Sequence, residues 1–169
     1  MRPGEISWWL EITLTEVDLP QRDMESEQGR KLIEVGEVGI GAGDEKMLDD
    51  YFNQEEYVFH GPQGEQDYPT TKAFFAAMRE TLEGYNCTRH DLIVKDDFIA
   101  ARTQMSGRFA KPFKGTPFGD IQPNGKDVKL ELINFFRYDE DGKLAEEWVQ
   151  CDFLGFYEQL GLKLVPQSG

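Results

Sequence analysis

Two segments with alternating residue character, 128–138 and 144–152, flank the stretch "RYDEDGKL" near the end of this chain. The alternation predicts two antiparallel strands, and Asp141-Gly142 predicts the turn of a hairpin between them. The loop is either these two residues or the four residues 139–142. Because both lengths are even, the same side chains share a face of the hairpin in either case.

One face of this hairpin is mostly apolar. Its predicted members are Leu130, Leu132, Asn134, Phe136, Ala145, Glu147, Val149 and Cys151. Asn134 and Glu147 are the strongly polar residues of this face, and they lie directly opposite or one step diagonal to each other. A carboxyl group in such a wall loses hydration in its charged form, so its pKa rises toward the range that a general acid or base needs. Glu147 is therefore a candidate catalytic residue, unless the hairpin is an edge and the carboxylate reaches solvent.

The order of the predicted elements indicates an α+β fold. Helical patterns cover residues 24–40, 44–52 and 70–84, a short strand covers 56–61, and four long strands cover 88–95, 98–108, 128–138 and 144–152. Residues 110–126 form a long connection rich in Gly and Pro. Helices followed by a run of antiparallel strands favour a curved sheet wrapped over the helices, which leaves a pocket.

Capping residues mark the predicted helix ends. Asp44 is the predicted N-cap of the second helix, and Thr70 or Thr71 is that of the third helix, which Gly84 ends. Asp152 follows the last strand and is the predicted N-cap of a short final helix.

Three glycines weaken the first predicted helix. Gly36, Gly39 and Gly41 lower its intrinsic stability. They also allow another backbone or a ligand to approach it closely.

The N-terminal residues, 1–24, form a predicted extension with an extra strand at residues 5–15. Alternation of apolar and polar residues favours the strand. A helix stays open as an alternative, because Ile6, Leu10 and Leu14 also fall at helical spacing.

An excess of acidic residues excludes some classes of partner. The chain has 169 residues, enough for one domain, with 18 Lys and Arg against 32 Asp and Glu. A formal net charge of -14 repels nucleic acid and anionic membrane surfaces, so we expect neither as a partner. Cys87 and Cys151 form neither a C-x-x-C motif nor a metal-ligand spacing. Because acidic residues interrupt the opening segment, we expect neither a signal peptide nor a membrane span, and we predict a cytoplasmic protein.

Several stretches together resemble the SnoaL-like polyketide cyclases. The match is clearest in "FGDIQPNGKDVKLELINFFRYDEDGKLAEEWVQCDFLGFYEQLG", and "GAGDEKMLDDYF", "YVFHGP" and "DDFIAARTQMSGRF" extend it over residues 28–161. The resemblance implies the cone-shaped α+β barrel of the nuclear transport factor 2-like superfamily, a pocket and a homodimer. It implies a domain over residues 25–161 and a tail over residues 162–169. These cyclases need no metal or cofactor: an aspartate on the last strand removes a proton next to a carbonyl group, and an aldol step closes a ring.

The resemblance also places the family's catalytic positions on this chain. The aspartate falls on Val149, which cannot move a proton, and a histidine of the preceding strand falls on Asn134, which can donate a hydrogen bond to an enolate oxygen. Glu147, on the same face, is the nearest ionisable replacement. His60, at the pocket mouth that "YVFHGP" implies, is the second candidate for proton transfer.

We therefore predict a cofactor-independent cyclase, isomerase or lyase that acts on a small hydrophobic carbonyl compound such as a polyketide. The predicted catalytic residues are Glu147, His60 and Asn134, and the predicted substrate-binding residues are Tyr57, Arg102, Leu132, Phe136 and Val149. Arg102 could equally lie on a solvated or dimer-facing strand.

Two other functions stay open at this point. The same cavity could hold a ligand without catalysis, with Val149 as the mark of lost acid-base function. Trp148 and its strand face could instead serve a purely structural dimer.

Overall fold

The computed structural model describes residues 24, 26–163 and 165. The strand predicted at residues 5–15 lies outside them, as does most of the predicted tail. The helices are α1 (Glu27–Glu34), the π-helix η2 (Val35–Ala42), α2 (Glu45–Tyr51), α3 (Tyr68–Thr81) and α4 (Phe153–Gln159). The strands are β1 (Val58–Gly61), β2 (Gly64–Gln66), β3 (Leu82–Lys95), β4 (Phe98–Phe109), β5 (Phe113–Thr116), β6 (Gly119–Ile121), β7 (Asp127–Tyr138) and β8 (Leu144–Cys151).

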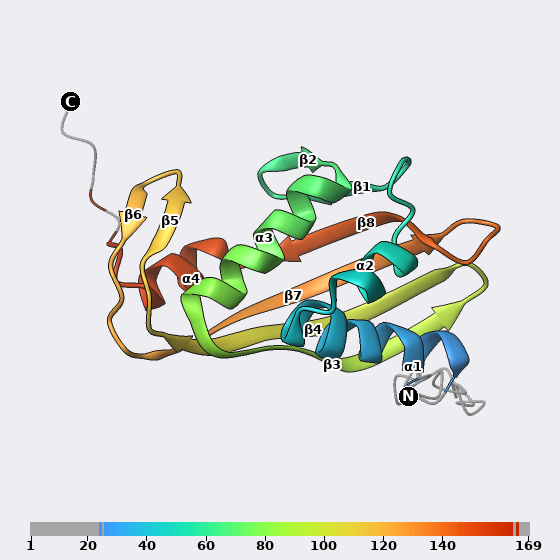
Figure 1. Ribbon diagram of the computed structural model, residues 1–169, viewed down its shortest axis with the longest axis horizontal. Coiled ribbons are helices and arrows are strands. Elements are labelled where there is room, and N and C mark those ends of the chain that lie inside the picture. The colour runs from blue at the N-terminus through green and yellow to red at the C-terminus, as the bar shows by residue number, and fades with distance from the viewer. Residues whose placement is uncertain (1–23, 25, 164, 166–169) are drawn as a thin grey trace, which may run out of the picture.

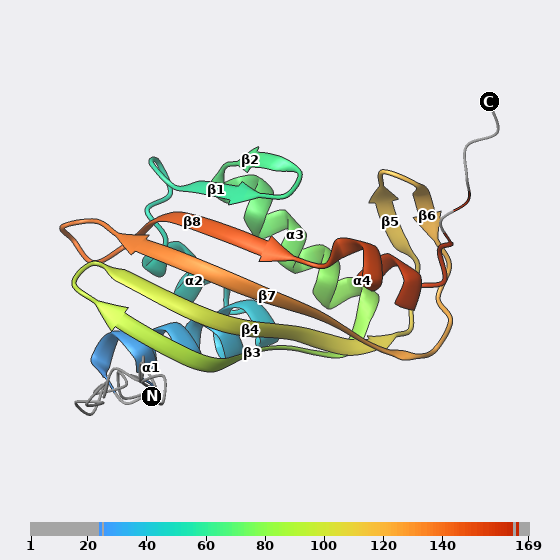
Figure 2. The ribbon, with the colours of Figure 1, turned by 180° about the vertical axis from the view of Figure 1, so that it is seen from behind.

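A six-stranded sheet, in the order β2-β1-β8-β7-β4-β3, forms one layer of the molecule. Neighbouring strands are antiparallel, except that β1 runs parallel to β8. The helices α1, α2 and α3, together with η2, lie against one face of this sheet (Figure 1). The view from behind shows the middle of β3, β4, β7 and β8 with no described helix over it (Figure 2). The predicted α+β fold, with helices packed on a mostly antiparallel sheet, is confirmed.

The alternation of β7 explains why the helices pack where they do. Its residues Val128, Leu130, Leu132, Asn134 and Phe136 are buried, whereas the residues between them are exposed. We call the buried side, which faces the helices, the inner face, and the opposite side the outer face. Burial of the inner face is the main stabilising contribution, since apolar surface leaves water there.

The start of α3 differs from the prediction. Asp67 is its N-cap and accepts a hydrogen bond from the Thr70 N–H at 3.0 Å, so the prediction of Thr70 or Thr71 was wrong. Pro69 in the first turn favours this earlier start, because a proline needs no hydrogen-bond donor there. The N-cap predicted at Asp44 is confirmed, since its carboxylate accepts from the Met47 N–H at 2.9 Å.

The end of α3 also differs. The helix stops at Thr81 and β3 begins at once with Leu82, so Gly84 does not end it. Leu82 pairs with Phe109 of β4, and both side chains are buried. Pairing with a distant strand therefore overrides the helical pattern of this segment.

The first predicted helix forms as two elements, α1 and η2. A Cβ atom on Gly36 would lie 2.9 Å from the backbone oxygen of Cys87 in β3. The prediction that these glycines admit another backbone is confirmed at Gly36.

The Gly- and Pro-rich connection contains the separate hairpin β5–β6. This hairpin stands beside α4, at one end of the six-stranded sheet (Figure 1). Phe118 at its turn packs edge to face on Tyr157 of α4, with ring centroids 5.0 Å apart.

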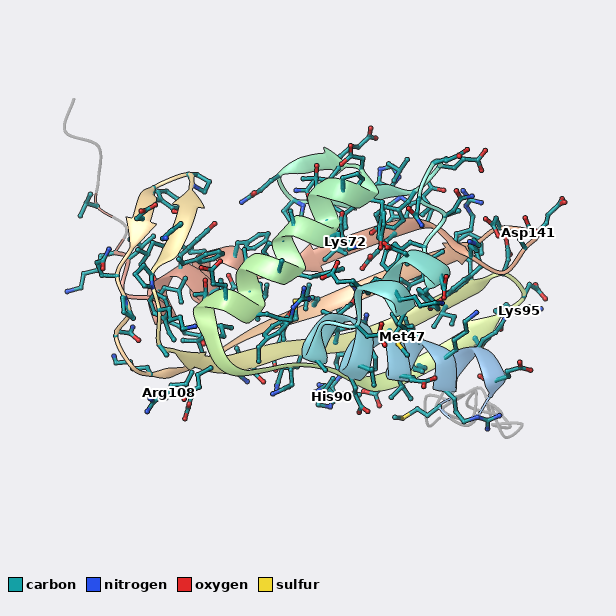
Figure 3. The ribbon with its side chains drawn as sticks, in the orientation of Figure 1. Met47, Lys72, His90, Lys95, Arg108 and Asp141 are labelled. Atoms are coloured by element: carbon teal, nitrogen blue, oxygen red, sulfur yellow. The ribbon has the colours of Figure 1, made fainter. Side chains whose placement is uncertain are left out.

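Charged side chains cover the outside of the helical layer and the sheet ends. Lys72 of α3 pairs with Glu45 and Asp49 of α2 at 2.9 and 2.6 Å. Lys95 and Asp141 mark the β3–β4 and β7–β8 turns at one end of the molecule (Figure 3).

The described helices are short. The longest is α3, with 14 residues, and none within the described ranges is both long and apolar enough to cross a membrane. The cytoplasmic location stays a prediction.

Candidate active site

A cavity of about 170 Å³ lies between the inner face of the sheet and the helices. Its lining is mostly apolar, with contributions from Leu32, Val35, Phe75, Leu132, Phe136 and Val149. The lining residues that are both polar and buried are Thr71, Arg89, Asn134 and Glu147. A small apolar ligand with a few polar atoms fits a cavity of this character.

The Glu147 carboxyl group lies in the wall of this cavity, and the residue is only 6% exposed. Its Oε1 accepts a hydrogen bond from Asn134 Nδ2 at 2.7 Å, and its Oε2 accepts one from the Tyr57 hydroxyl at 2.9 Å. Burial raises the pKa of Glu147, and it outweighs the opposing effects of Arg89 and the two hydrogen bonds. The carboxyl group is thus more basic than a glutamate in water, which favours a role as general acid or base.

The register of the β7–β8 hairpin places Asn134 beside Glu147. Asn134 pairs with Val149 and Phe136 pairs with Glu147, so Asn134 is one step diagonal to the carboxylate. This is the register of the shorter predicted loop. A bulge at the Arg137/Tyr138 end of the ladder preserves it although the loop is longer.

A chain of hydrogen bonds crosses the sheet toward Glu147. The guanidinium of Arg89 on β3 donates through Nη1 to the Thr103 hydroxyl on β4. The Thr103 hydroxyl donates to Asn134 Oδ1 at 2.7 Å, and Asn134 then donates to Glu147. Because an arginine can only donate, the Thr103 hydroxyl must accept the hydrogen bond from Arg89 and donate its own O–H to Asn134. The direction of each hydrogen bond from Arg89 to Glu147 is therefore determined.

Arg89 is a buried charged residue at this site that the sequence did not indicate. It is only 5% exposed and lines the cavity, and its guanidinium lies 5.1 Å from the centre of the Phe136 ring. A signal was present, because Arg89 continues the buried alternation of Tyr85 and Cys87 along β3. The general expectation that arginine is exposed hid this signal.

Comparison with models of known protein families identifies the family of this chain. A model described as SnoaL-like polyketide cyclase matches residues 40–160, which is most of the chain. The chain belongs to the SnoaL-like polyketide cyclase family. No curated protein matches the sequence.

Solved structures support the fold of this SnoaL-like chain. It is similar to AclR from Streptomyces galilaeus, described as a candidate hydroxylase, with a TM-score of 0.68, 18% identity, and coverage of 83% of this chain and 85% of AclR. It is similar to TsrD from Streptomyces laurentii, with a TM-score of 0.64, 28% identity, and coverage of 83% and 97%. It is also similar to IdmH from Streptomyces antibioticus, described as a candidate polyketide cyclase, with a TM-score of 0.65, 18% identity, and coverage of 80% and 99%.

Most of the predicted substrate-binding residues lie around this cavity of the SnoaL-like fold. Leu132, Phe136 and Val149 line it. Tyr57 is buried and contacts the site through its hydrogen bond to Glu147. Val149, where the resemblance places the family's aspartate, is apolar and 2% exposed, so Glu147 is the acid on this stretch of β8 that reaches the cavity.

The structure does not bring His60 to Glu147. His60 pairs with Trp148 in the parallel β1–β8 ladder and lies on the outer face, where its ring stacks on Trp148 with centroids 5.2 Å apart. Its Nε2 lies 2.8 Å from Glu146 Oε1. The alternation of β1 sends Phe59, not His60, to the cavity.

Arg102 also lies away from the cavity. It is exposed on β4, and its Nε donates to Asp91 Oδ2 at 2.9 Å. A side chain so placed cannot bind a ligand inside the cavity, which agrees with the alternative of a solvated or dimer-facing strand.

The remaining candidates for site chemistry are structural. Asp152 accepts from the Gly155 N–H at 2.8 Å, which confirms the predicted N-cap of α4. Cys87 and Cys151 are free thiols, and burial raises the pKa of Cys151 to about 11. Among the residues that the structure describes, there is no group of three or more His, Cys, Asp or Glu side chains that could hold a metal ion.

Proposed function

We propose that this chain is a cofactor-independent acid/base enzyme that moves a proton next to the carbonyl group of a small hydrophobic compound. The observation that carries the proposal is the Glu147 carboxyl group, buried in the wall of an apolar cavity and held by Asn134 and Tyr57. Cyclisation, isomerisation and elimination all begin with such a proton transfer. Membership of the SnoaL-like family supports a substrate of the polyketide class.

In the proposed reaction, Glu147 acts first as a general base. One carboxylate oxygen takes a proton from the carbon next to the carbonyl group, and the electrons of that C–H bond move to form an enolate. The enolate then attacks a second carbonyl carbon, expels a leaving group, or takes the proton back at another carbon. Glu147 returns its proton in the same cycle, so no external reductant or oxidant is needed.

In this proposal, Asn134 stabilises the enolate oxygen. A side-chain amide has two N–H donors, and Asn134 uses one of them on Glu147. The second is available to an oxygen beside the carboxyl group, in a cavity that this residue lines. A donor aimed at developing negative charge typically contributes several kcal/mol in a site that excludes water.

Exchange of the hydrogen next to a ketone for deuterium tests this proposal directly. A panel of small aliphatic and aromatic ketones in D₂O is followed by NMR with the wild type, Glu147→Gln and Glu146→Gln. Glu146 is the matched control, because it neighbours Glu147 but lies on the outer face and pairs with Arg137 at 2.7 Å. We expect Glu147→Gln to lower the exchange rate at least about 100-fold, and Glu146→Gln to leave it near that of the wild type. Equal rates for Glu147→Gln and the wild type would refute Glu147 as the base.

A non-catalytic binding protein is the second candidate, because the residue at the family's aspartate position is Val149. In that case the ketones bind in the cavity, no exchange is catalysed, and Glu147→Gln binds them as tightly as the wild type.

We also propose that the outer face of the sheet pairs with a second copy of the chain. The large apolar residues Ile93, Phe98, Ile133 and Phe135 are exposed on this face. An exposed apolar surface of this kind is typical of a protein–protein interface.

A further inference from the structure

Arg89 carries a positive charge into the buried interior beside the cavity. Its guanidinium packs over Phe136, donates to Thr103 through Nη1, and has no hydrogen-bond partner at Nε. A buried charge is strongly unfavourable unless an opposite charge compensates it. Apolar packing alone therefore does not stabilise this arginine, and an opposite charge nearby is needed.

Glu147 is the group that can compensate the positive charge of Arg89. The ionisable groups that interact electrostatically with Arg89 are Tyr51 of α2, Tyr57, Tyr85 and Cys87 of β3, Tyr138 of β7 and Glu147 of β8. Burial raises the pKa of each of the four tyrosines and of the Cys87 thiol, so these groups are neutral at pH 7. Among the described groups near Arg89, Glu147 is thus the one that can balance its charge.

Arg89 also fixes the orientation of the Asn134 amide, through the hydrogen bonds that join them. Because Arg89 donates to Thr103, the Thr103 hydroxyl must donate to Asn134 Oδ1. Asn134 Oδ1 is then an acceptor, and the amide nitrogen must point to Glu147. Reversal of the amide would place its oxygen against the carboxylate and would remove the N–H donor from the cavity.

We propose that Arg89 is the positioning residue of this site: it is the fixed counter-charge of the reaction, and it orients Asn134 through Thr103. This inference rests on the proposed function. Before proton transfer the negative charge lies on Glu147. After transfer Glu147 is neutral and the charge lies on the enolate, in the same cavity. One buried guanidinium therefore balances both states, and the transfer separates no additional charge.

The charge effect is tested by titration of Glu147, without any substrate. The carboxyl stretch in infrared difference spectra, assigned with Glu147→Gln, reports the pKa of Glu147 in the wild type, Arg89→Met and Arg89→Lys. We expect Arg89→Met to raise this pKa by about 1–3 units, because it removes an opposite charge. Arg89→Lys keeps the charge, and the pKa should stay closer to that of the wild type. An unchanged pKa in folded Arg89→Met would overturn the role as counter-charge.

The orienting effect is tested at Thr103, which keeps the charge of Arg89 in place. Thr103→Val removes the hydroxyl at nearly constant volume, and Thr103→Ser retains it. We expect Thr103→Val to lower the exchange rate about 10-fold to 100-fold, with Thr103→Ser restoring most of the loss. Equal exchange rates for Thr103→Val and Thr103→Ser would overturn the orienting role. This test does not depend on whether Arg89→Met folds.

The two proposals fail separately in these experiments. If Glu147→Gln leaves exchange unchanged while Arg89→Met shifts the pKa of Glu147, the role of Arg89 as counter-charge is supported and the proposed enzymatic function is refuted. If Glu147→Gln abolishes exchange while neither the Arg89 nor the Thr103 variants have an effect, the proposed enzymatic function is supported and the positioning role of Arg89 is refuted.

Discussion

Glu147 experiences opposing influences on its charge. Burial favours its neutral form, whereas Arg89 and the hydrogen bonds from Tyr57 and Asn134 favour the carboxylate, and burial is the larger effect. The pKa of this carboxyl group is therefore raised above its ordinary value, which is the direction that makes a glutamate a better general base.

The raised pKa of Glu147 predicts a pH dependence of stability. The folded protein binds this proton more tightly than the unfolded chain does, so the contribution is present below the ordinary pKa of 4.5 and is lost as pH rises through the folded pKa. Relative to Glu147→Gln, the unfolding free energy of the wild type should fall with rising pH. The slope is about 1.4 kcal/mol for each pH unit within this window. Urea unfolding of both proteins between pH 4 and 8 measures the difference.

Glu146→Gln is the control with the opposite sign. Burial acts to raise the pKa of Glu146, but hydrogen bonds from His60 and Arg137 outweigh it and lower that pKa. Its contribution is therefore present above its ordinary pKa and is lost as pH falls through the folded pKa. A pH-independent difference between the wild type and Glu147→Gln would contradict the buried titration of Glu147.

At the scale of elements, the contact between η2 and β3 determines how close the helical layer lies to Arg89. Gly36 meets the backbone oxygen of Cys87, and its Cβ position is 3.5 Å from Arg89 Nε. A side chain at residue 36 would push the helix away from the strand that carries the arginine.

Gly36→Ala should therefore destabilise the protein by about 1–3 kcal/mol, although alanine is the better helix former. Gly41→Ala is the matched control in the same π-helix, since its Cβ would approach no atom closer than 3.4 Å. We expect this control to change the unfolding free energy by less than about 1 kcal/mol. Chemical denaturation of both variants checks the prediction, and equal effects would refute the steric argument.

At the scale of the whole molecule, one apolar row crosses the outer face. Ile93, Ala100, Phe135, Trp148 and His60 are successive partners across the neighbouring strands β3, β4, β7, β8 and β1. Phe98 adds to this row by stacking on Trp148, with ring centroids 6.2 Å apart. The helices cover the inner face, so this is the large face of the sheet that a second copy can reach (Figure 2).

A charge in this row should weaken the proposed dimer. Phe135 is 51% exposed, and Phe135→Lys places an ammonium group where the second copy would pack. Leu154→Lys is the matched control, because Leu154 is 49% exposed but lies on α4. Sedimentation equilibrium should show a dissociation constant at least about 10-fold higher for Phe135→Lys, which corresponds to about 1.4 kcal/mol, and no change for the control. A monomeric wild type would refute the interface.

The sequence by itself determined the elements and the two faces of the last hairpin. Asn134 and Glu147 share the inner face because strand alternation has a period of two and the hairpin is a local structure. The same local argument correctly predicted the N-caps at Asp44 and Asp152.

Only the tertiary structure decided which other groups reach Glu147. The parallel pairing of β1 with β8 turns Tyr57 and Phe59 inward and His60 outward, and the alternation of a short strand cannot predict which set faces the core. Arg89 meets the site across β4 and β7, through pairings between residues far apart in the chain. Alternation is a property of neighbouring residues, whereas burial of a charge depends on every strand and helix that packs around it.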